Sequence, residues 1–221
     1  MTDNKPLRVV FFGDSICVGQ GVSLYKGWVT RIAQELDELG AAHGREIIVV
    51  NSSINGRVTR QALEDMPYHV QSGGVDIMVV QFGMNDCNYW QSDNGLARVS
   101  KKAFAANLEE IIERGRRFGA KKIILNNNHP TSRIKDVFPN TNITYQDSNE
   151  EYNQIIRQLA HELDNEIIFN DVEEFFNKNL KKDEDVDKYL LSDQLHLSEN
   201  GHRLYYDYLS PIIKKIVLEL L

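Results

Sequence analysis

The sequence predicts an α/β protein built on a doubly wound parallel sheet of about five strands, with helices on both faces. Short apolar runs rich in valine and isoleucine alternate with helix-like patterns, and this alternation is typical of buried parallel strands joined by right-handed crossovers. The expected strands lie at Leu7–Phe12, Glu46–Asn51, Val75–Phe82, Lys121–Leu125 and Glu166–Phe169.

Apolar residues at three- and four-residue spacing predict the helices between and after these strands. The segments concerned are Trp28–Leu39, Thr59–Val70, Leu96–Phe118, Asn149–Leu163 and Asn200–Leu221. Gly40 and Gly119 are expected to end the first and the third. The connection Asn126–Ser148 is long and rich in asparagine, threonine and serine. Because it follows a strand, we expect it to overhang any site at that edge of the sheet.

The composition excludes several classes of function. With 42% hydrophobic and 26% charged residues, the 221-residue chain has the balance of an ordinary globular protein. A net charge of −7 disfavours partners such as nucleic acid or an anionic membrane. The polar segment Met1–Pro6 lacks the apolar core of an export signal, so a cytoplasmic location is expected. Cys17 and Cys87 are too few for a disulfide scaffold and have no metal-ligand spacing.

A serine follows the first expected strand, in the segment Phe11–Ile16. Ligands of open parallel sheets bind beyond the carboxyl ends of the strands, so Ser15 is a candidate nucleophile. Gly13, two residues earlier, permits a tight backbone at this corner. The alternative is that Asp14 and Ser15 cap the next helix, which is a frequent use of both residue types.

A second motif, Asp193-Gln194-Leu195-His196, stands directly before the C-terminal helix. A histidine three residues after an aspartate can present Nδ1–H to the carboxylate and keep Nε2 free to take a proton from a serine. If His196 meets Ser15, residues 1–221 form a single domain. Capping by Asp193 or Ser198, with His196 on the surface, is the alternative.

Two further segments follow strands at the same expected edge of the sheet. Asn85 comes two residues after Gly83, and its side-chain amide can donate to an oxyanion. Gly56 has no side chain to block the approach of its backbone N–H to a substrate oxygen. Both are also ordinary turn residues. We interpret Asp86 as structural, although a substrate contact stays open.

With Ser15, Gly56, Asn85 and His196 in this order, the chain resembles the SGNH hydrolases, also called the GDSL esterase/lipase family. The resemblance implies a flavodoxin-like, three-layer α/β/α fold. It also implies an oxyanion hole formed by the N–H groups of Ser15 and Gly56 and by the Asn85 amide, with Asp193 orienting His196.

The resemblance covers nearly the whole chain, from Gly13 to Gly201. Ile16 stands where the family's name has leucine. The glycine block, Ser53–Thr59, lacks the second glycine of many members, which leaves Gly56 as its one glycine.

Other architectures fit the residues less well. An α/β-hydrolase elbow needs Gly-x-Ser-x-Gly, and Cys17 stands at its last position. A phosphoacceptor domain built on Asp14 would leave Asn85 and His196 unexplained.

We therefore expect a serine esterase that forms an acyl-enzyme, needs no metal or organic cofactor, and has a small-molecule ester as its partner. The polar segment Asn126–Ser148 predicts short acyl groups, acetyl above all, on a polar alcohol such as a carbohydrate, because a long acyl chain needs a buried apolar groove. Asp14, Asn128 and His129 are the candidate substrate contacts. An O-acyltransferase with the same triad, or a lipase or thioesterase, is the alternative, and a non-catalytic binding module is the least favoured.

Overall fold

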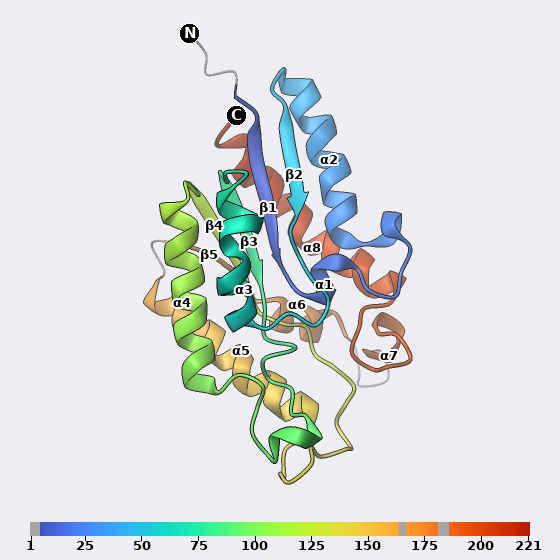
Figure 1. Cartoon of the computed structure of the whole chain (residues 1–221). Helices are drawn as coiled ribbons and strands as arrows, with labels where there is room; N and C mark the ends of the chain where they lie inside the picture. The colour runs from blue at the N-terminus through green and yellow to red at the C-terminus, as the bar shows by residue number, and fades with distance from the viewer. Residues whose placement is uncertain (1–4, 164–166, 181–185) are drawn as a thin grey trace.

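A five-stranded, all-parallel sheet forms the centre of the protein, as a computed structural model that describes residues 5–163, 167–180 and 186–221 shows (Figure 1). The strand order is β2-β1-β3-β4-β5. This confirms the predicted doubly wound sheet. The strands are β1 (Leu7–Gly13), β2 (Ile47–Asn51), β3 (Ile77–Gln81), β4 (Lys122–Asn126) and β5 (Ile168–Asn170).

The strand order reverses between β1 and β3. From β1 the chain crosses to β2 on one side, and β3 returns to pair with β1 on the other. At the carboxyl end of this pair, Gly13 lies in register with Gln81. Loops leave in opposite directions at such a switch point and open a crevice there, which is where open sheets bind ligands.

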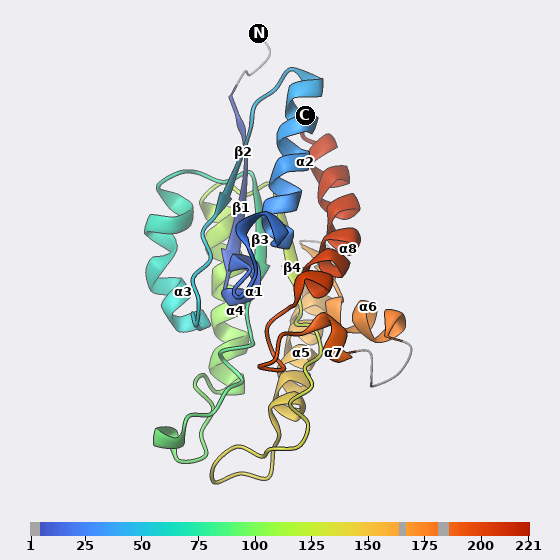
Figure 2. The ribbon, with the colours of Figure 1, turned by 90° about the vertical axis from the view of Figure 1, so that its right-hand side faces the viewer.

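Helices cover both faces of the sheet. The longer helices are α2 (Trp28–His43), α3 (Thr59–Met66), α4 (Lys101–Arg117), α5 (Tyr145–Glu162), α6 (Val172–Asn179) and α8 (Glu199–Leu218). The short ones are α1 (Ser15–Val18), α7 (Val186–Tyr189), and the single turns η1 (Leu24–Lys26), η2 (Pro67–Gln71) and η3 (Gln91–Asp93). Helices α2 and α8 pack together on one face, and α3 and α4 cover the other (Figure 2).

Buried stripes on the helices fix this arrangement. On α2, Trp28 and Ile32 are one turn apart and fully buried, and on α8 Tyr205 and Leu209 repeat the pattern. The rings of Trp28 and Tyr205 lie 4.8 Å apart, which joins the two helices directly above β1. Within the described residues no helix is both long and apolar enough to cross a membrane.

Several expected boundaries were wrong. Helix α2 continues through Gly40 to His43 because Gly40 is a packing position, where a Cβ would lie 2.6 Å from the carbonyl oxygen of Arg45. The helix ends instead at Gly44, whose φ is 66°. The expected helix over Thr59–Val70 ends at Met66, where Pro67 begins the turn η2.

Two more helices begin elsewhere than expected. Helix α4 starts five residues after Leu96, because Ser100 caps it. Helix α5 starts four residues before Asn149, so the last turn of the segment expected as a loop is helical. Glu166, the expected start of the last strand, lies outside the described residues.

Candidate active site

Ser15 is the first residue of α1, directly beyond the carboxyl end of β1. Asp14 caps this short helix, with its Oδ1 accepting a hydrogen bond from Ile16 N–H at 3.0 Å. The corner requires glycine at position 13, because a Cβ there would lie 2.7 Å from both Cys17 Sγ and the Gln81 carbonyl oxygen. The capping interpretation therefore holds for Asp14 and leaves the Ser15 hydroxyl available.

The Ser15 hydroxyl meets the histidine from the far end of the chain. Ser15 Oγ lies 2.9 Å from His196 Nε2, and His196 Nδ1 lies 2.6 Å from Asp193 Oδ2. The other carboxylate oxygen, Asp193 Oδ1, accepts the backbone N–H groups of Leu195 and His196 at 3.0 Å each. The predicted spacing thus places serine, imidazole and carboxylate in one hydrogen-bonded line.

The carboxylate of Asp193 is held in its charged form. Burial alone would raise its pKa, but hydrogen bonds from the His196 ring and from two backbone N–H groups outweigh burial and lower the pKa. A charged Asp193 keeps the proton of the neutral imidazole on Nδ1, so Nε2 faces Ser15 as an acceptor.

The turn that carries His196 is fastened to the connection between β4 and α5. His129 Nε2 donates to the Leu195 carbonyl at 2.9 Å, and Arg133 Nε donates to the Asp193 carbonyl at 2.9 Å. Ser132 N–H donates to the Gln194 carbonyl at 3.2 Å. Sequence reasoning placed this connection at the site but missed that it braces the turn that carries His196.

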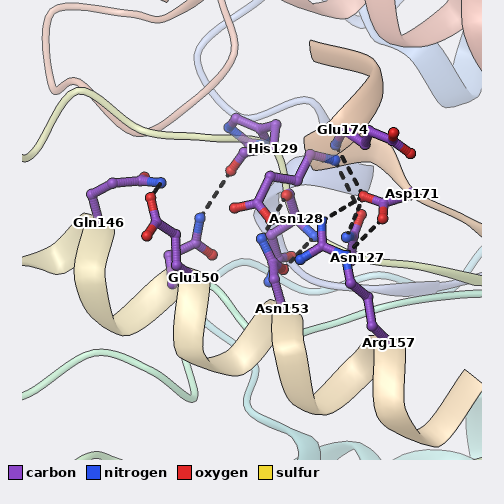
Figure 3. Close-up of polar contacts among 11 residues, drawn as sticks. Asn127, Asn128, His129, Gln146, Glu150, Asn153, Arg157, Asp171 and Glu174 are labelled. Atoms are coloured by element: carbon purple, nitrogen blue, oxygen red, sulfur yellow. Dashed lines mark hydrogen bonds and ion pairs between the residues drawn. The ribbon is translucent and has the colours of Figure 1, made fainter. Parts of the chain in front are cut away.

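The start of the same connection lies beneath the surface. Asn128 and His129 are fully buried and belong to a polar network with helix α5 (Figure 3). Asn153 binds the backbone of Asn128 through both ends of its amide, and Asn149 Nδ2 donates to the His129 carbonyl at 3.0 Å. Their predicted contact with substrate stays a prediction that this burial disfavours.

The amide of Asn85 reaches the serine corner from the end of β3. Asn85 Nδ2 lies 3.4 Å from Oδ2 of Asp14, the residue directly before Ser15. Gly83 turns the chain toward this position with a φ of 129°, a conformation that favours glycine. Asn85 is partly exposed, which leaves part of its amide open to a ligand.

Gly56 lies on an exposed turn after β2. Its φ is 76°, so the turn itself favours glycine, and a Cβ there would meet nothing within 4 Å. The turn closes with a bond from Arg57 N–H to the Ile54 carbonyl at 3.2 Å, and Ile54 N–H donates to the Gly13 carbonyl at 3.2 Å. The glycine loop is thereby tied to the strand that carries Ser15.

Two buried carboxyl groups lie behind these donors. Burial raises the pKa of Asp14 to about 7, the N–H of Ile16 opposes this rise, and nearby Asp86 adds to it. Burial likewise raises the pKa of Asp86 to about 6, against hydrogen bonds from Thr59. Both residues are fully buried. Burial disfavours the predicted substrate contact of Asp14 and fits the structural interpretation of Asp86.

Cys17 and Cys87 are buried and free, as expected for two isolated thiols. Among residues 5–163, 167–180 and 186–221, no group of three or more His, Cys, Asp or Glu side chains is arranged to hold a metal ion.

Comparison with known proteins decides the family. The model of the GDSL-like lipase/acylhydrolase family matches residues 11–204. The chain belongs to this family. The match includes both the serine corner and the histidine turn.

Among curated relatives, an arylesterase of Vibrio mimicus is 25% identical over 59% of this chain and 61% of its own length. Esterase TesA of Pseudomonas aeruginosa is 28% identical over 51% of this chain and 50% of its own length. The chain thus spans between half and two thirds of the curated relatives it matches. An acetylxylan esterase of Geobacillus stearothermophilus, Axe2, has a similar structure, with a TM-score of 0.73, 21% identity and 94% coverage of each chain. That likeness shows a shared fold.

Proposed function

We propose that this family member is a serine esterase that hydrolyses a short-chain acyl ester, acetyl above all, on a polar alcohol such as a carbohydrate. The observation that carries the proposal is the hydrogen-bonded line from Ser15 Oγ through His196 to Asp193. A serine hydroxyl becomes nucleophilic when an oriented imidazole can take its proton, and this line provides that arrangement.

The proposed reaction has two halves. His196 Nε2 takes the Ser15 proton while Oγ bonds to the ester carbonyl carbon, whose oxygen becomes an oxyanion. The oxyanion is held by the N–H groups of Ser15 and Gly56 and by Asn85 Nδ2. Collapse expels the alcohol oxygen, which takes the proton from His196. Water, deprotonated by His196, then attacks the acyl-enzyme, and release of the acid restores the Ser15 hydroxyl.

The choice of alcohol rests on the surface around Gly56. A hollow of about 270 Å³ borders this glycine. Its lining is mainly polar and includes Asn55, Gln61, Glu64 and Asp65. Hydroxyl groups of a sugar find donors and acceptors there. Arg57 also lines the hollow and pairs with Asp65 at 3.4 Å, so Glu64 is the lining carboxylate that is left to disfavour an anionic leaving group. The fold shared with an acetylxylan esterase agrees with this choice.

The polar segment Asn126–Ser148 does not line the site as the sequence predicted, so it gives little support to a preference for short acyl groups. Asn126, Asn127 and Asn128 are fully buried, so they do not form a wall that substrate can touch. Arg133 and Asn140, further along, do reach the surface. The preference for short acyl groups therefore rests on two observations. The hollow beside Gly56 is polar, and only 5% of the surface of Ser15 is exposed, which leaves little room for a long acyl chain.

Ser15→Ala should abolish turnover of a chromogenic acetyl ester while the far-UV circular dichroism stays unchanged, because Asp14 and not Ser15 caps α1. Ser72→Ala is the matched control, since Ser72 is exposed and its hydroxyl bonds only to the backbone of Tyr68 among the described residues. Retained activity in Ser15→Ala would rule out this nucleophile.

The substrate claim needs a separate measurement. We expect kcat/KM to fall along monomeric acetyl, butyryl, octanoyl and palmitoyl esters, and a steady rise toward palmitoyl would indicate a lipase or thioesterase instead. Product analysis with an added sugar alcohol tests the acyltransferase alternative, which predicts a transferred acyl group in place of free acid.

A further inference from the structure

One arginine joins the two loops that carry the proposed oxyanion donors. Arg98 Nη1 lies 3.3 Å from the Gly56 carbonyl oxygen and 3.5 Å from Asn85 Oδ1. Arg98 itself belongs to the segment between η3 and α4, outside both loops. Neither the family motifs nor the triad geometry assigns it a role.

The backbone around Arg98 is fixed to the Asn85 loop. Arg98 N–H donates to the Asn88 carbonyl at 2.8 Å, and Val99 N–H donates to the Asp86 carbonyl at 3.2 Å. The arginine side chain therefore extends from an anchored backbone. From there its guanidinium group reaches Gly56 and Asn85.

The guanidinium group is also braced on one face. Its central carbon lies 4.3 Å from the centre of the Trp90 ring, a cation–π contact. Trp90 is about half exposed, at 51%. Burial lowers the pKa of Arg98, against the attraction of Asp86, but an arginine keeps its charge at any physiological pH. The brace thus holds a permanent cation beside the Asn85 amide.

The charges around Asn85 set the orientation of its amide. The cationic Arg98 faces the oxygen, Oδ1, while the carboxyl of Asp14 faces the nitrogen, Nδ2. Both distances are long for hydrogen bonds, so the orienting force is mainly the attraction of opposite charges for the two ends of the amide dipole. A flipped amide would turn its oxygen toward Asp14 and its nitrogen toward Arg98, which is unfavourable at both ends.

We propose that Arg98, braced by Trp90, is a positioning residue that orients the Asn85 amide and holds the Gly56 turn so that both present N–H groups to the substrate oxyanion. The inference rests on the proposed function, because it concerns the same oxyanion. Arg98 acts through these two residues and touches no reacting atom.

Removal of this cation should affect the transition state more than substrate binding. In Arg98→Ala the Asn85 amide samples both orientations and the Gly56 carbonyl loses its side-chain partner. Loss of a whole oxyanion donor lowers kcat by about a hundred- to a thousandfold, so misorientation should lower kcat by about 10- to 100-fold with KM changed less than about threefold.

Arg203→Ala is the matched control. Arg203 lies over the Tyr206 ring at 5.6 Å and pairs with Asp207, so it is also a ring-stacked arginine, but it lies on the outer surface of α8. Its removal should leave kcat and KM unchanged. Millimolar methylguanidine should restore part of kcat to Arg98→Ala and have no effect on Asn85→Ala.

A double-mutant cycle separates positioning from general support of the fold. If Arg98 acts through Asn85, Arg98→Ala should cost less in an Asn85→Ala background than in the native chain. Additive losses, an unchanged kcat, or a loss that resides in KM would overturn the proposal. Ser15→Ala separates failure of the Arg98 proposal from failure of the proposed function. If Ser15→Ala stays active, the proposed function is wrong, whereas an inactive Ser15→Ala with an unaffected Arg98→Ala contradicts only the role of Arg98.

If Arg98→Ala does not fold, Trp90→Ala decides the question. Trp90 is half exposed, so its truncation should leave the fold intact while it frees the guanidinium group. A several-fold lower kcat with unchanged KM supports the inference, and an unchanged kcat overturns it.

Discussion

The turn Asp193–His196 contacts Ser15 directly, and the turn that carries Gly56 is bonded to Gly13 at the same corner, but the two turns are held in different ways. Backbone and side-chain donors from the β4–α5 connection fix the turn Asp193–His196, including a fully buried histidine, His129. Gly56 lies on an exposed turn, and in the described part of the chain Arg98 is the one side chain that donates to it. The turn Asp193–His196 is therefore held by several donors from one neighbouring segment, whereas the turn that carries Gly56 has its backbone bond to Gly13, the Arg57 bond to the Ser52 carbonyl, and one half-buried cation from another loop.

Asp193→Asn should give the largest effect on the histidine side. An asparagine can still accept the two backbone N–H groups, but it presents an NH₂ group to His196 Nδ1 and forces the ring proton onto Nε2. The imidazole then cannot accept from Ser15, and we expect kcat to fall by about a thousandfold or more. Steady-state kinetics with the acetyl ester measure this loss.

Because the fold keeps its backbone bonds, the melting temperature of Asp193→Asn should change little. Asp207→Asn, a change at a surface carboxylate on α8, is the control and should keep full activity. Full activity in Asp193→Asn would mean that another carboxylate orients the histidine.

A smaller effect is expected when the brace behind the turn is removed. His129→Phe keeps the buried ring and loses the donor to the Leu195 carbonyl. Loss of the partner of this partly buried carbonyl should cost about 1 kcal/mol, and a looser turn should lower kcat by about tenfold. Chemical denaturation and kinetics measure the two quantities.

His202→Phe is a matched control for this change. His202 is also buried, and neither ring nitrogen has a hydrogen-bond partner within residues 5–163, 167–180 and 186–221. The same substitution there removes no bond and should not lower stability. If both variants lose equal stability, the contact between His129 and Leu195 contributes nothing specific.

The smallest effect on rate is expected on the oxyanion side, from Asp14→Asn. The new amide would keep the cap on α1 but lose the negative charge that attracts Asn85 Nδ2, so kcat should fall several-fold. The same substitution should raise stability.

The native Asp14 carboxyl has a pKa of about 7 in the folded protein and near 3.8 in the unfolded chain. Its burial therefore destabilises the fold increasingly as pH rises between these values.

Asp14→Asn has no carboxyl to ionise, so its free energy of unfolding does not fall in this way as pH rises. Its advantage in the free energy of unfolding should be near zero at about pH 4 and reach a few kcal/mol at about pH 8, since each pKa unit corresponds to about 1.4 kcal/mol. Denaturation at several pH values tests the trend. An advantage that is independent of pH would contradict a buried, titrating Asp14.

The sequence predicted the sheet and the reactive groups because both leave local signals. Apolar runs mark buried strands, and the residues at the strand ends share one edge, so Ser15 and Asn85 could be placed near each other, while the Asp-x-x-His spacing marked His196. The burial of a polar residue in a connecting segment leaves no such signal in the sequence. Asn128 and His129 were interpreted as substrate contacts because polar residues in a loop usually face water, and here α5 covers them.

Residues that act from a distance in sequence were also missed. Arg98 follows no motif, and its contacts with Gly56 and Asn85 exist only after three loops have come together. Gly40 was expected to end a helix, since neither its packing against Arg45 nor the later glycine stop could be distinguished from the letters alone.

Gly83 sets a limit on how this site can be varied. Its backbone adopts a conformation that side chains rarely enter, and a Cβ there would overlap the side-chain amide of Asn128. The Asn128 side chain has little room to move aside, because it is fully buried and its Oδ1 accepts from Gln81 Nε2 at 3.4 Å. A saturation library at this position, selected for activity, should return glycine almost exclusively, whereas Gly44, which has open space around it, should admit asparagine.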